Sequence, residues 1–322
     1  MSNKSTHMGV QYIEVEPDRE GQRLDNFLAG ILRGVPRTLI YRIVRTGEVR
    51  VNKGRIRPAY KLQAGDIVRI PPVRSNEQIE LNSGSGALQK VISRLQDAIL
   101  FEGPDFMVLN KPAGLAVHGG SGLKFGLIEA LKSAGTPYAG LELVHRLDRS
   151  TSGCLLLAKT RSCLQRLHTL IRERKMEKHY FALLQGEIRK PVTIDTALSR
   201  RQRGGERLVH VAECDGVRNK EALTFIEPKR VYAGKTLALI RIDTGRTHQI
   251  RVHCASINHP LAGDEKYGDR EFNAYMRGLG LKRLFLHAAG LRFTLDETFV
   301  IEAPLPDDLT TVLENLDARQ PL

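Results

Sequence analysis

The stretch that decides the fold of the larger part of the chain is residues 144–153, VHRLDRSTSG, which runs directly into residues 154–158, CLLLA. The apolar run predicts a β-strand, so the polar residues lie where the strand begins, and a rigid scaffold can hold a reactive side chain there. Asp148 is flanked by Arg146 and Arg149, which favour its charged form and attract phosphate. An ionised aspartate can attack an electrophilic carbon without a neighbouring base. Taken alone, the motif is more often a surface ion pair in a loop.

A second polar stretch, residues 243–253 (DTGRTHQIRVH), follows residues 237–242, which are apolar except for Arg241. The order predicts a strand, a glycine turn and a helix, with Thr247 as the N-cap. Arg251 then falls on the first turn of the helix, where its guanidinium could bind a carboxylate through two parallel hydrogen bonds. An arginine on a helix is more often a solvated surface charge, so this motif does not establish a site by itself.

The rest of this part of the chain, residues 88–320, has no regular strand–helix–strand repeat. Short apolar runs, such as residues 99–101, 106–109 and 181–184, alternate irregularly with helical patterns near residues 127–134 and 162–174. This pattern predicts an α+β domain around a mixed or antiparallel sheet.

Residues 14–75 have a separate pattern. Two apolar sets at helical spacing predict a helix pair that ends at Gly47; they are Leu24, Phe27, Leu28 and Ile31, then Leu39, Ile40, Ile43 and Val44. Short strands follow, around the turn Asn52-Lys53-Gly54 and at residues 67–70, which predicts a small αα-then-β module. Residues 76–87, NEQIELNSGSGA, are polar and rich in glycine and serine, so we expect a flexible linker between two independently moving domains.

The charge of the chain points to a polyanionic partner. It has 322 residues, 49 Lys and Arg against 36 Asp and Glu, and a net charge of +13. Between residues 37 and 61 only Glu48 is acidic, whereas eight residues are basic: Arg37, Arg42, Arg45, Arg50, Lys53, Arg55, Arg57 and Lys61. The alternative is a solvated basic face, but this local excess on a folded unit favours a surface that contacts nucleic-acid phosphates.

Other motifs are missing from the sequence. There is no apolar run long enough to span a membrane and no signal peptide, so we expect a soluble cytoplasmic protein. No phosphate-binding or dinucleotide fingerprint and no close grouping of Cys and His predicts a cofactor or a metal. No unpaired apolar face predicts a partner subunit, so we expect a monomer.

The small module resembles the α-L RNA-binding motif found in ribosomal protein S-four. The similarity lies in residues 23–25 (RLD), in the second helix with Arg42 and Arg45, and in residues 49–52 (VRVN) and 64–66 (AGD).

The larger domain resembles the family of pseudouridine synthases that act on large-subunit ribosomal RNA and transfer RNA. The matching blocks cover nearly all of the chain after Leu88 in order and spacing: residues 110–118 (NKPAGLAVH), 145–159 (HRLD through TSG to AK), 244–253 (TGRTHQIRVH), 263–268 (GDEKYG) and 286–288 (LHA). Ser150 departs from the pattern, because relatives often carry a second aspartate at this variable position.

This resemblance implies the isomerisation of specific uridines to pseudouridine in large-subunit (23S) ribosomal RNA, without a cofactor. It implies that Asp148 is the catalytic aspartate, Arg251 its salt-bridge partner and Ile250 an apolar wall of the uracil pocket. Tyr180 is expected to stack on the base, although residue statistics alone would place it in the core. Arg146 matches the arginine that enters the RNA when the target nucleotide leaves its stack. Attack on the ribose, attack on the base and a glycal route are all compatible with the sequence.

Two other functions fit parts of the sequence. A non-catalytic ribosome-binding protein would use the same charge and the same N-terminal module, but it has no use for an aspartate between arginines that faces an arginine-bearing helix. An RNA N-glycosidase would share the carboxylate and release free base. Mass spectrometry separates these functions, because isomerisation leaves the RNA mass unchanged whereas loss of a base lowers it.

Overall fold

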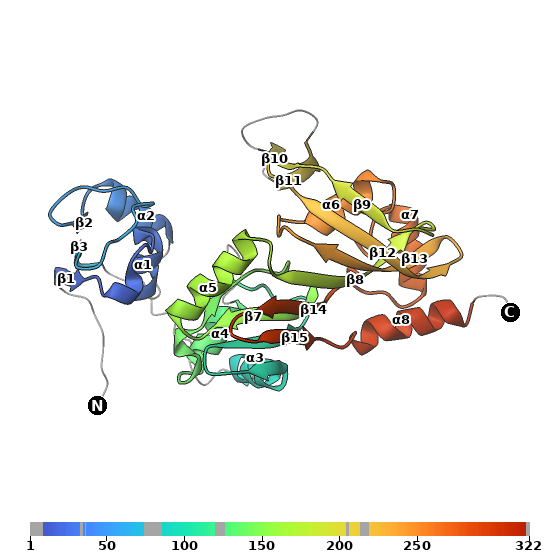
Figure 1. Cartoon of the computed structure of the whole chain (residues 1–322), viewed down its shortest axis with the longest axis horizontal. Helices are drawn as coiled ribbons and strands as arrows, with labels where there is room; N and C mark the ends of the chain where they lie inside the picture. The colour runs from blue at the N-terminus through green and yellow to red at the C-terminus, as the bar shows by residue number, and fades with distance from the viewer. Residues whose placement is uncertain are drawn as a thin grey trace. The chain divides into compact units, whose positions relative to one another are not determined.

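The computed structural model describes residues 9–32, 35, 37–73, 86–119, 126–203, 206–212 and 219–319 (Figure 1). The chain divides into two compact units, Met1–Gln89 and Lys90–Leu322. Residues 76–85 of the predicted linker lie outside the described residues. Its last two residues, Gly86 and Ala87, are not linker but the start of helix α3 (Gly86–Asp97).

The small unit packs two helices against a sheet. Helices α1 (Leu24–Ile31) and α2 (Arg37–Arg45) confirm the predicted helix pair. The three-stranded antiparallel sheet has the order β1-β3-β2, with β1 at Gln11–Glu14, β2 at Arg50–Val51 and β3 at Ile67–Ile70. Strand β1 precedes the helices and was not apparent in the sequence, because four residues are too few for a clear alternation. The buried core includes Leu24, Leu28, Ile40, Leu62 and Val68.

The turn at Asn52-Lys53-Gly54 is stabilised by hydrogen bonds to Asp66 and Ile67. Asn52 and Lys53 have positive φ angles of 49° and 68°, as the predicted turn requires. The side chain of Asn52 donates to the buried carboxylate of Asp66 at 2.7 Å and accepts the backbone N–H of Ile67 at 2.8 Å. These hydrogen bonds therefore hold the backbone between the basic residues Arg50 and Lys53 at the edge of the core.

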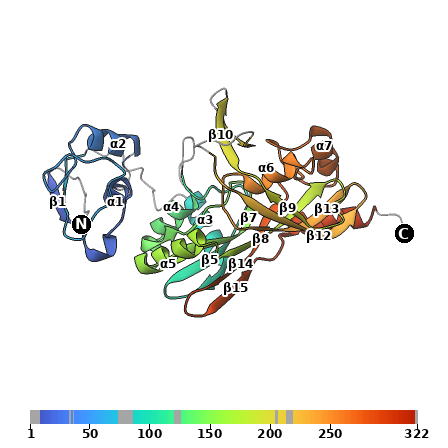
Figure 2. The ribbon, with the colours of Figure 1, turned by 45° about the horizontal axis from the view of Figure 1, so that its top comes forward.

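The larger unit is built on a ten-stranded mixed sheet (Figures 1 and 2). Its strands are β4 (Ile99–Glu102), β5 (Phe106–Lys111), β6 (Glu142–Leu143), β7 (Ser152–Ala158), β8 (Glu177–Gln185), β9 (Val192–Asp195), β12 (Leu223–Tyr232), β13 (Lys235–Ile242), β14 (Leu286–Thr294) and β15 (Thr298–Glu302). The order is β4-β5-β7-β14-β8-β13-β12-β9, with β15 paired to β14 and β6 to β7. Only β7 and β14 pair in parallel among these described strands. The predicted α+β class with a mixed sheet is confirmed.

Helices and one hairpin complete this unit. Helices α4 (Leu127–Ser133) and α5 (Arg161–Arg172) confirm the two helices predicted from the sequence. The other α-helices that follow are α6 (Gln249–Ser256), α7 (Arg270–Gly278) and α8 (Asp307–Asp317), and a short 3-10 helix lies at Tyr138–Gly140. A separate hairpin of β10 (Leu198–Arg203) and β11 (Glu206–Val211) projects from the sheet in both views (Figures 1 and 2).

The parallel pair of β7 and β14 positions the polar stretch that precedes β7. Every residue of β7 is buried, and Gly153 pairs with Ala288 of β14. Gly153 has a φ of 107°, and a Cβ atom added to it would overlap the backbone carbonyl of Ala288. Ala288 is also paired with Tyr180 of β8. Only glycine fits here, and the fit holds the start of β7 against β14, whose other edge pairs with the strand that carries Tyr180.

We predict that Gly153→Ala destabilises the protein by at least about 3 kcal/mol, because it combines a left-handed φ with a backbone clash. Gly234→Ala is the matched control, since Gly234 also has a positive φ of 69° but has open space around it. We expect the control to cost about 1 to 2 kcal/mol. Chemical denaturation of both variants measures the difference, and equal losses would show that the contact with Ala288 is unimportant.

Candidate active site

The loop that carries Asp148 is held on both sides. The Nε2 atom of His145 accepts the backbone N–H of Leu156 in β7 at 3.1 Å. Burial, assisted by the positive charge of Lys178, lowers the pKa of His145 to about 4, so the ring is neutral and can accept this bond. On the other side, the Nε atom of Arg149 donates to the carbonyl of Gly114 at 2.9 Å, and the N–H of Gly114 donates to the carbonyl of Arg149 at 2.7 Å.

A buried lysine connects the same loop to the first matching block. The side chain of Lys111 is fully buried, and burial lowers its pKa to about 7. Its Nζ atom donates to the carbonyls of Pro112 and Leu115 at 2.9 Å and to that of Arg149 at 3.4 Å. Residues 110–118 therefore form the scaffold behind Asp148, a role that the sequence did not reveal.

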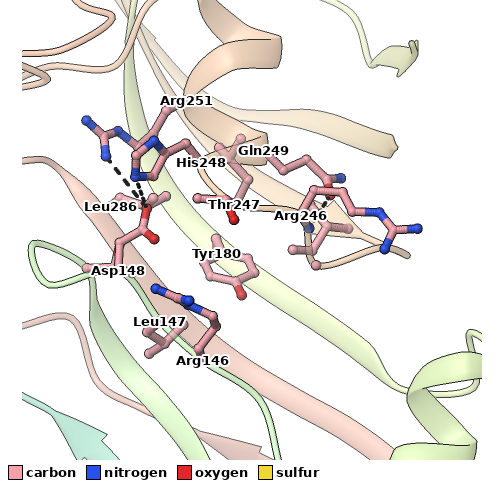
Figure 3. A pocket seen from close by; sticks show the side chains of 14 residues that line it. Arg146, Leu147, Asp148, Tyr180, Arg246, Thr247, His248, Gln249, Arg251 and Leu286 are labelled. Atoms are coloured by element: carbon pink, nitrogen blue, oxygen red, sulfur yellow. Dashed lines mark hydrogen bonds and ion pairs between the residues drawn. The ribbon is translucent and has the colours of Figure 1, made fainter. Parts of the chain in front are cut away.

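A single pocket collects the residues predicted for the reaction (Figure 3). It encloses about 500 Å³ of empty space, counting its open mouth. Its lining comprises Arg146, Leu147, Asp148, Thr151, Tyr180, Ile242, Gly245, Arg246, Thr247, His248, Gln249, Ile250, Arg251 and Leu286. The Asp148 loop, strand β8 and helix α6 are far apart in the sequence, and the fold brings their five predicted residues to one cavity.

Tyr180 forms part of the apolar side of this pocket. It lies on β8, next to Ile240 of β13 and Ala288 of β14 in the sheet, and only 7% of its surface is exposed. Burial, followed by the negative charge of Asp148, raises the pKa of Tyr180. The phenol is therefore neutral and presents an aromatic ring beside the carboxylate, together with Ile250 and Leu286.

Arg251 contacts two carboxylates. Its Nε and Nη2 atoms each donate to Asp264 at 2.7 Å, while its Nη1 atom lies 3.6 Å from Oδ2 of Asp148. The predicted two-bond arrangement therefore exists, but the carboxylate in it is Asp264, which the sequence did not single out. Burial acts to raise the pKa of Asp264, but the hydrogen bond and charge of Arg251 outweigh burial and lower it.

A histidine that the sequence did not single out also faces Asp148. The predicted N-cap at Thr247 is wrong, since the N-cap of α6 is His248, in the left-handed conformation at φ 54° and ψ 21°. Its Nε2 atom lies 3.7 Å from Oδ2 of Asp148, and its Nδ1 atom lies 2.9 Å from the hydroxyl of Tyr267. His248 and Tyr267 both lie in blocks that match the family, so the sequence did mark them. The local sequence pattern does not show, however, that these two blocks contact each other.

Gln249 holds the turn before α6. Its Oε1 atom accepts the hydroxyl of Thr244 at 2.7 Å and the backbone N–H of Arg246 at 3.1 Å. Its Nε2 atom donates to the carbonyl of Leu223 at 3.0 Å. These bonds fix the direction in which the first turn of α6 presents its side chains.

On the small unit, six of the predicted RNA-contacting residues are exposed: Arg42, Arg45, Arg50, Lys53, Arg55 and Arg57. None of these six forms an ion pair with another residue that the structure describes. Arg37 begins α2, and its side chain lies outside the description.

The described parts of the chain lack two other features. No group of three or more His, Cys, Asp or Glu side chains there is placed to hold a metal ion. No described helix has the length and apolar character needed to cross a membrane.

We predict that Asp264→Asn lowers the free energy of unfolding by about 3 to 5 kcal/mol, because it leaves the buried guanidinium of Arg251 without its charge partner. Asp296→Asn is the matched control, since Asp296 also binds an arginine, Arg166, through two hydrogen bonds but is 86% exposed. The control should cost no more than about 1 kcal/mol. Denaturation curves of the two variants test this, and losses of similar size would contradict it.

Comparison with known proteins agrees with this geometry. Residues 105–256 match the family model described as RNA pseudouridylate synthase, and residues 22–68 match the S4 domain. The chain is 49% identical to ribosomal large subunit pseudouridine synthase C of Escherichia coli O157:H7, over 97% of this chain and 98% of that protein. It is 50% identical to the protein of the same name from Yersinia pestis, over 95% of both chains.

Solved structures show the same fold. Human RNA Pseudouridylate Synthase Domain Containing 4 superposes with a TM-score of 0.61 at 24% identity, covering 72% of this chain and 97% of that one. Human RNA Pseudouridylate Synthase Domain Containing 1 gives a TM-score of 0.53 at 31% identity, covering 65% and 83%. With near-complete coverage by relatives at about half identity, this chain belongs to the family of RNA pseudouridylate synthases.

Proposed function

We propose that this protein converts specific uridines of large-subunit (23S) ribosomal RNA to pseudouridine, with Asp148 as the catalytic carboxylate. The observation that carries the proposal is that Asp148, Tyr180 and Arg251 line one pocket. The choice of RNA rests on relatives named for the ribosomal large subunit, which match 97% and 95% of this chain.

The reaction needs only groups that side chains supply. The bond between N1 of uracil and C1′ of ribose breaks, the uracil turns, and C5 bonds to C1′. The proton on C5 is lost and N1 gains one, so atoms and electrons balance and no cofactor is required. A carboxylate beside the flipped nucleotide serves attack on the sugar, attack on the base, or a glycal route.

The walls of the pocket suit a detached base. Tyr180 would stack on the uracil, and Ile250 would form an apolar wall against it. Arg251 would hold Asp148 in place through the contact at 3.6 Å. Exclusion of water matters here, because water would hydrolyse a glycosyl intermediate.

Arg146 is proposed to enter the RNA when the target uridine leaves its stack. It lies two residues before Asp148 on the same loop, so one rigid segment would supply both the carboxylate and the inserted side chain. Flipping a base costs a few kcal/mol, which stacking on Tyr180 and phosphate contacts would offset.

Residues 14–75 are proposed as the RNA-anchoring domain and residues 88–320 as the catalytic domain, joined by the linker predicted at residues 76–87, of which the last two residues begin helix α3. The phosphate contacts of the anchoring domain would come from Arg37, Arg42, Arg45, Arg50, Lys53, Arg55 and Arg57. We propose that the protein acts as a monomer in the cytoplasm.

We predict that Asp148→Asn abolishes pseudouridine formation and leaves RNA affinity within about threefold of wild type, because the amide keeps the shape but loses the nucleophilic charge. Mapping of pseudouridine in ribosomal RNA, together with binding measurements, tests this. Asp296→Asn, the same substitution at an exposed site, should retain full activity. Normal pseudouridine formation by Asp148→Asn would reject the assignment, and release of free uracil by the wild type would indicate a glycosidase instead.

We also predict that neutralising Arg42, Arg45 and Arg57 to Gln weakens the salt dependence of RNA binding. Each lost phosphate contact lowers the slope of log affinity against log salt by about 0.7 to 0.9, so three losses should lower it by about 2 to 3. The control variant changes Lys190, Arg277 and Lys282, which are exposed on the larger unit, to Gln. If both variants flatten the slope equally, net charge alone is responsible and the small unit is not an anchor.

A further inference from the structure

We infer that His248, held by Tyr267 with its proton on Nε2, positions Asp148 by donating a hydrogen bond to its Oδ2 atom and leaves Oδ1 as the reacting oxygen. The inference rests on the proposed role of Asp148 in the reaction. The inference adds His248 as a positioning residue. Neither the sequence motif around Asp148 nor the salt bridge of Arg251 indicated this role.

The backbone of His248 directs its ring into the pocket. A left-handed conformation is uncommon for a residue other than glycine, and such conformations persist where the surroundings over-determine them, often at functional sites. At this N-cap position the ring lies beside Arg251 and faces the carboxylate of Asp148 (Figure 3). The Nε2 to Oδ2 distance of 3.7 Å is one that a small shift on substrate binding would shorten to a hydrogen bond.

The contacts of Tyr267 decide which ring nitrogen carries the proton. The Tyr267 hydroxyl accepts the backbone N–H of Val209 in β11 at 3.3 Å and lies 2.9 Å from Nδ1 of His248. A phenol has one proton to donate, and among the described residues Nδ1 of His248 is the only acceptor within hydrogen-bond distance of this hydroxyl, so we assign the phenol proton to Nδ1. Nδ1 therefore accepts, and the proton of the neutral imidazole resides on Nε2, the nitrogen that faces Asp148.

The ring acts as a neutral donor. Burial lowers the pKa of His248, and although the charge of Asp148 opposes this, the net direction is downward. A neutral N–H holds the carboxylate in place without adding a second full positive charge beside it. The nucleophilic character of Asp148 is thereby weakened less than it would be by another cation.

Both partners of Asp148 contact the same oxygen. Nη1 of Arg251 and Nε2 of His248 lie 3.6 Å and 3.7 Å from Oδ2. Among the described residues no hydrogen bond involves Oδ1, and the closest nitrogen of each partner faces Oδ2. Two donors on one oxygen restrict rotation of the carboxylate and leave the other oxygen available to the flipped nucleotide.

The test compares two amides at position 248. The amide nitrogen of Gln can take the place of Nε2, whereas that of Asn takes the place of Nδ1, and Asn tolerates the left-handed backbone. We expect His248→Gln to keep the single-turnover rate of pseudouridine formation within about threefold of wild type. His248→Asn should slow it about tenfold or more, with RNA affinity unchanged, because the donor to Oδ2 is lost.

If His248 had a purely structural role, His248→Asn would be tolerated better than His248→Gln, because Asn adopts the left-handed backbone more readily. The order of the two single-turnover rates therefore distinguishes a structural role from a positioning role. The inference fails if His248→Asn reacts as fast as His248→Gln, whether both are fast or both are slow. Thermal denaturation checks that each variant is folded. Asp148→Asn separates this from failure of the proposed function: if that variant is inactive while His248→Asn matches His248→Gln, only the inference is wrong.

Tyr267→Phe tests the assignment of the proton. Without the hydroxyl, Nδ1 can carry the proton, so the rate of the otherwise wild-type enzyme should fall about threefold. The same change in the His248→Gln variant should have no further effect, because the amide has no second tautomer. Equal slowing in both backgrounds would show that Tyr267 acts independently of His248 and would overturn this part of the inference.

Discussion

The buried ion pair between Arg251 and Asp264 is the interaction on which the geometry of the pocket depends. A guanidinium with so little exposure is tolerated only when its charge and its donors are matched, and Asp264 provides both through two bonds of 2.7 Å. Asp264 is itself held, because its Oδ1 atom accepts the N–H groups of Lys266 and Tyr267. The pair thus joins α6 to the turn that carries Tyr267, and it leaves Nη1 of Arg251 directed at Asp148.

Three further polar residues hold the segments that carry the pocket and are not themselves reactive groups. Lys111 and His145 fasten the Asp148 loop to β5 and β7, and Gln249 fastens the turn before α6. Each is buried or largely buried, and its polar atoms bond to backbone groups or hydroxyls, which is what burial of a polar side chain requires. A carboxylate supported in this way keeps its orientation while a flexible RNA substrate adapts to it.

The two units would contribute to RNA recognition in different ways. Arg42, Arg45, Arg50, Arg55 and Arg57 of the small unit are exposed and form no ion pair with a described residue. They therefore suit phosphate contacts, which position an RNA but read little of its sequence. The pocket of the larger unit is small and partly apolar, so on the proposed function it would select the flipped base. Affinity and chemistry would then be separable, because they rest on different parts of the chain.

The sequence by itself determined the local structure: the helix pair of the small unit, helices α4 and α5, the buried strand β7 and the motif that carries Asp148. These follow from the spacing of nearby apolar residues and from the resemblance of several motifs to one family. Only the tertiary structure decided that Arg251 binds Asp264 through two bonds, that His248 rather than Thr247 is the N-cap of α6, and that Tyr267 reaches His248. The physical reason is that such contacts depend on strand order and on the packing of distant segments, and neither leaves a periodic signal in the residues that make them.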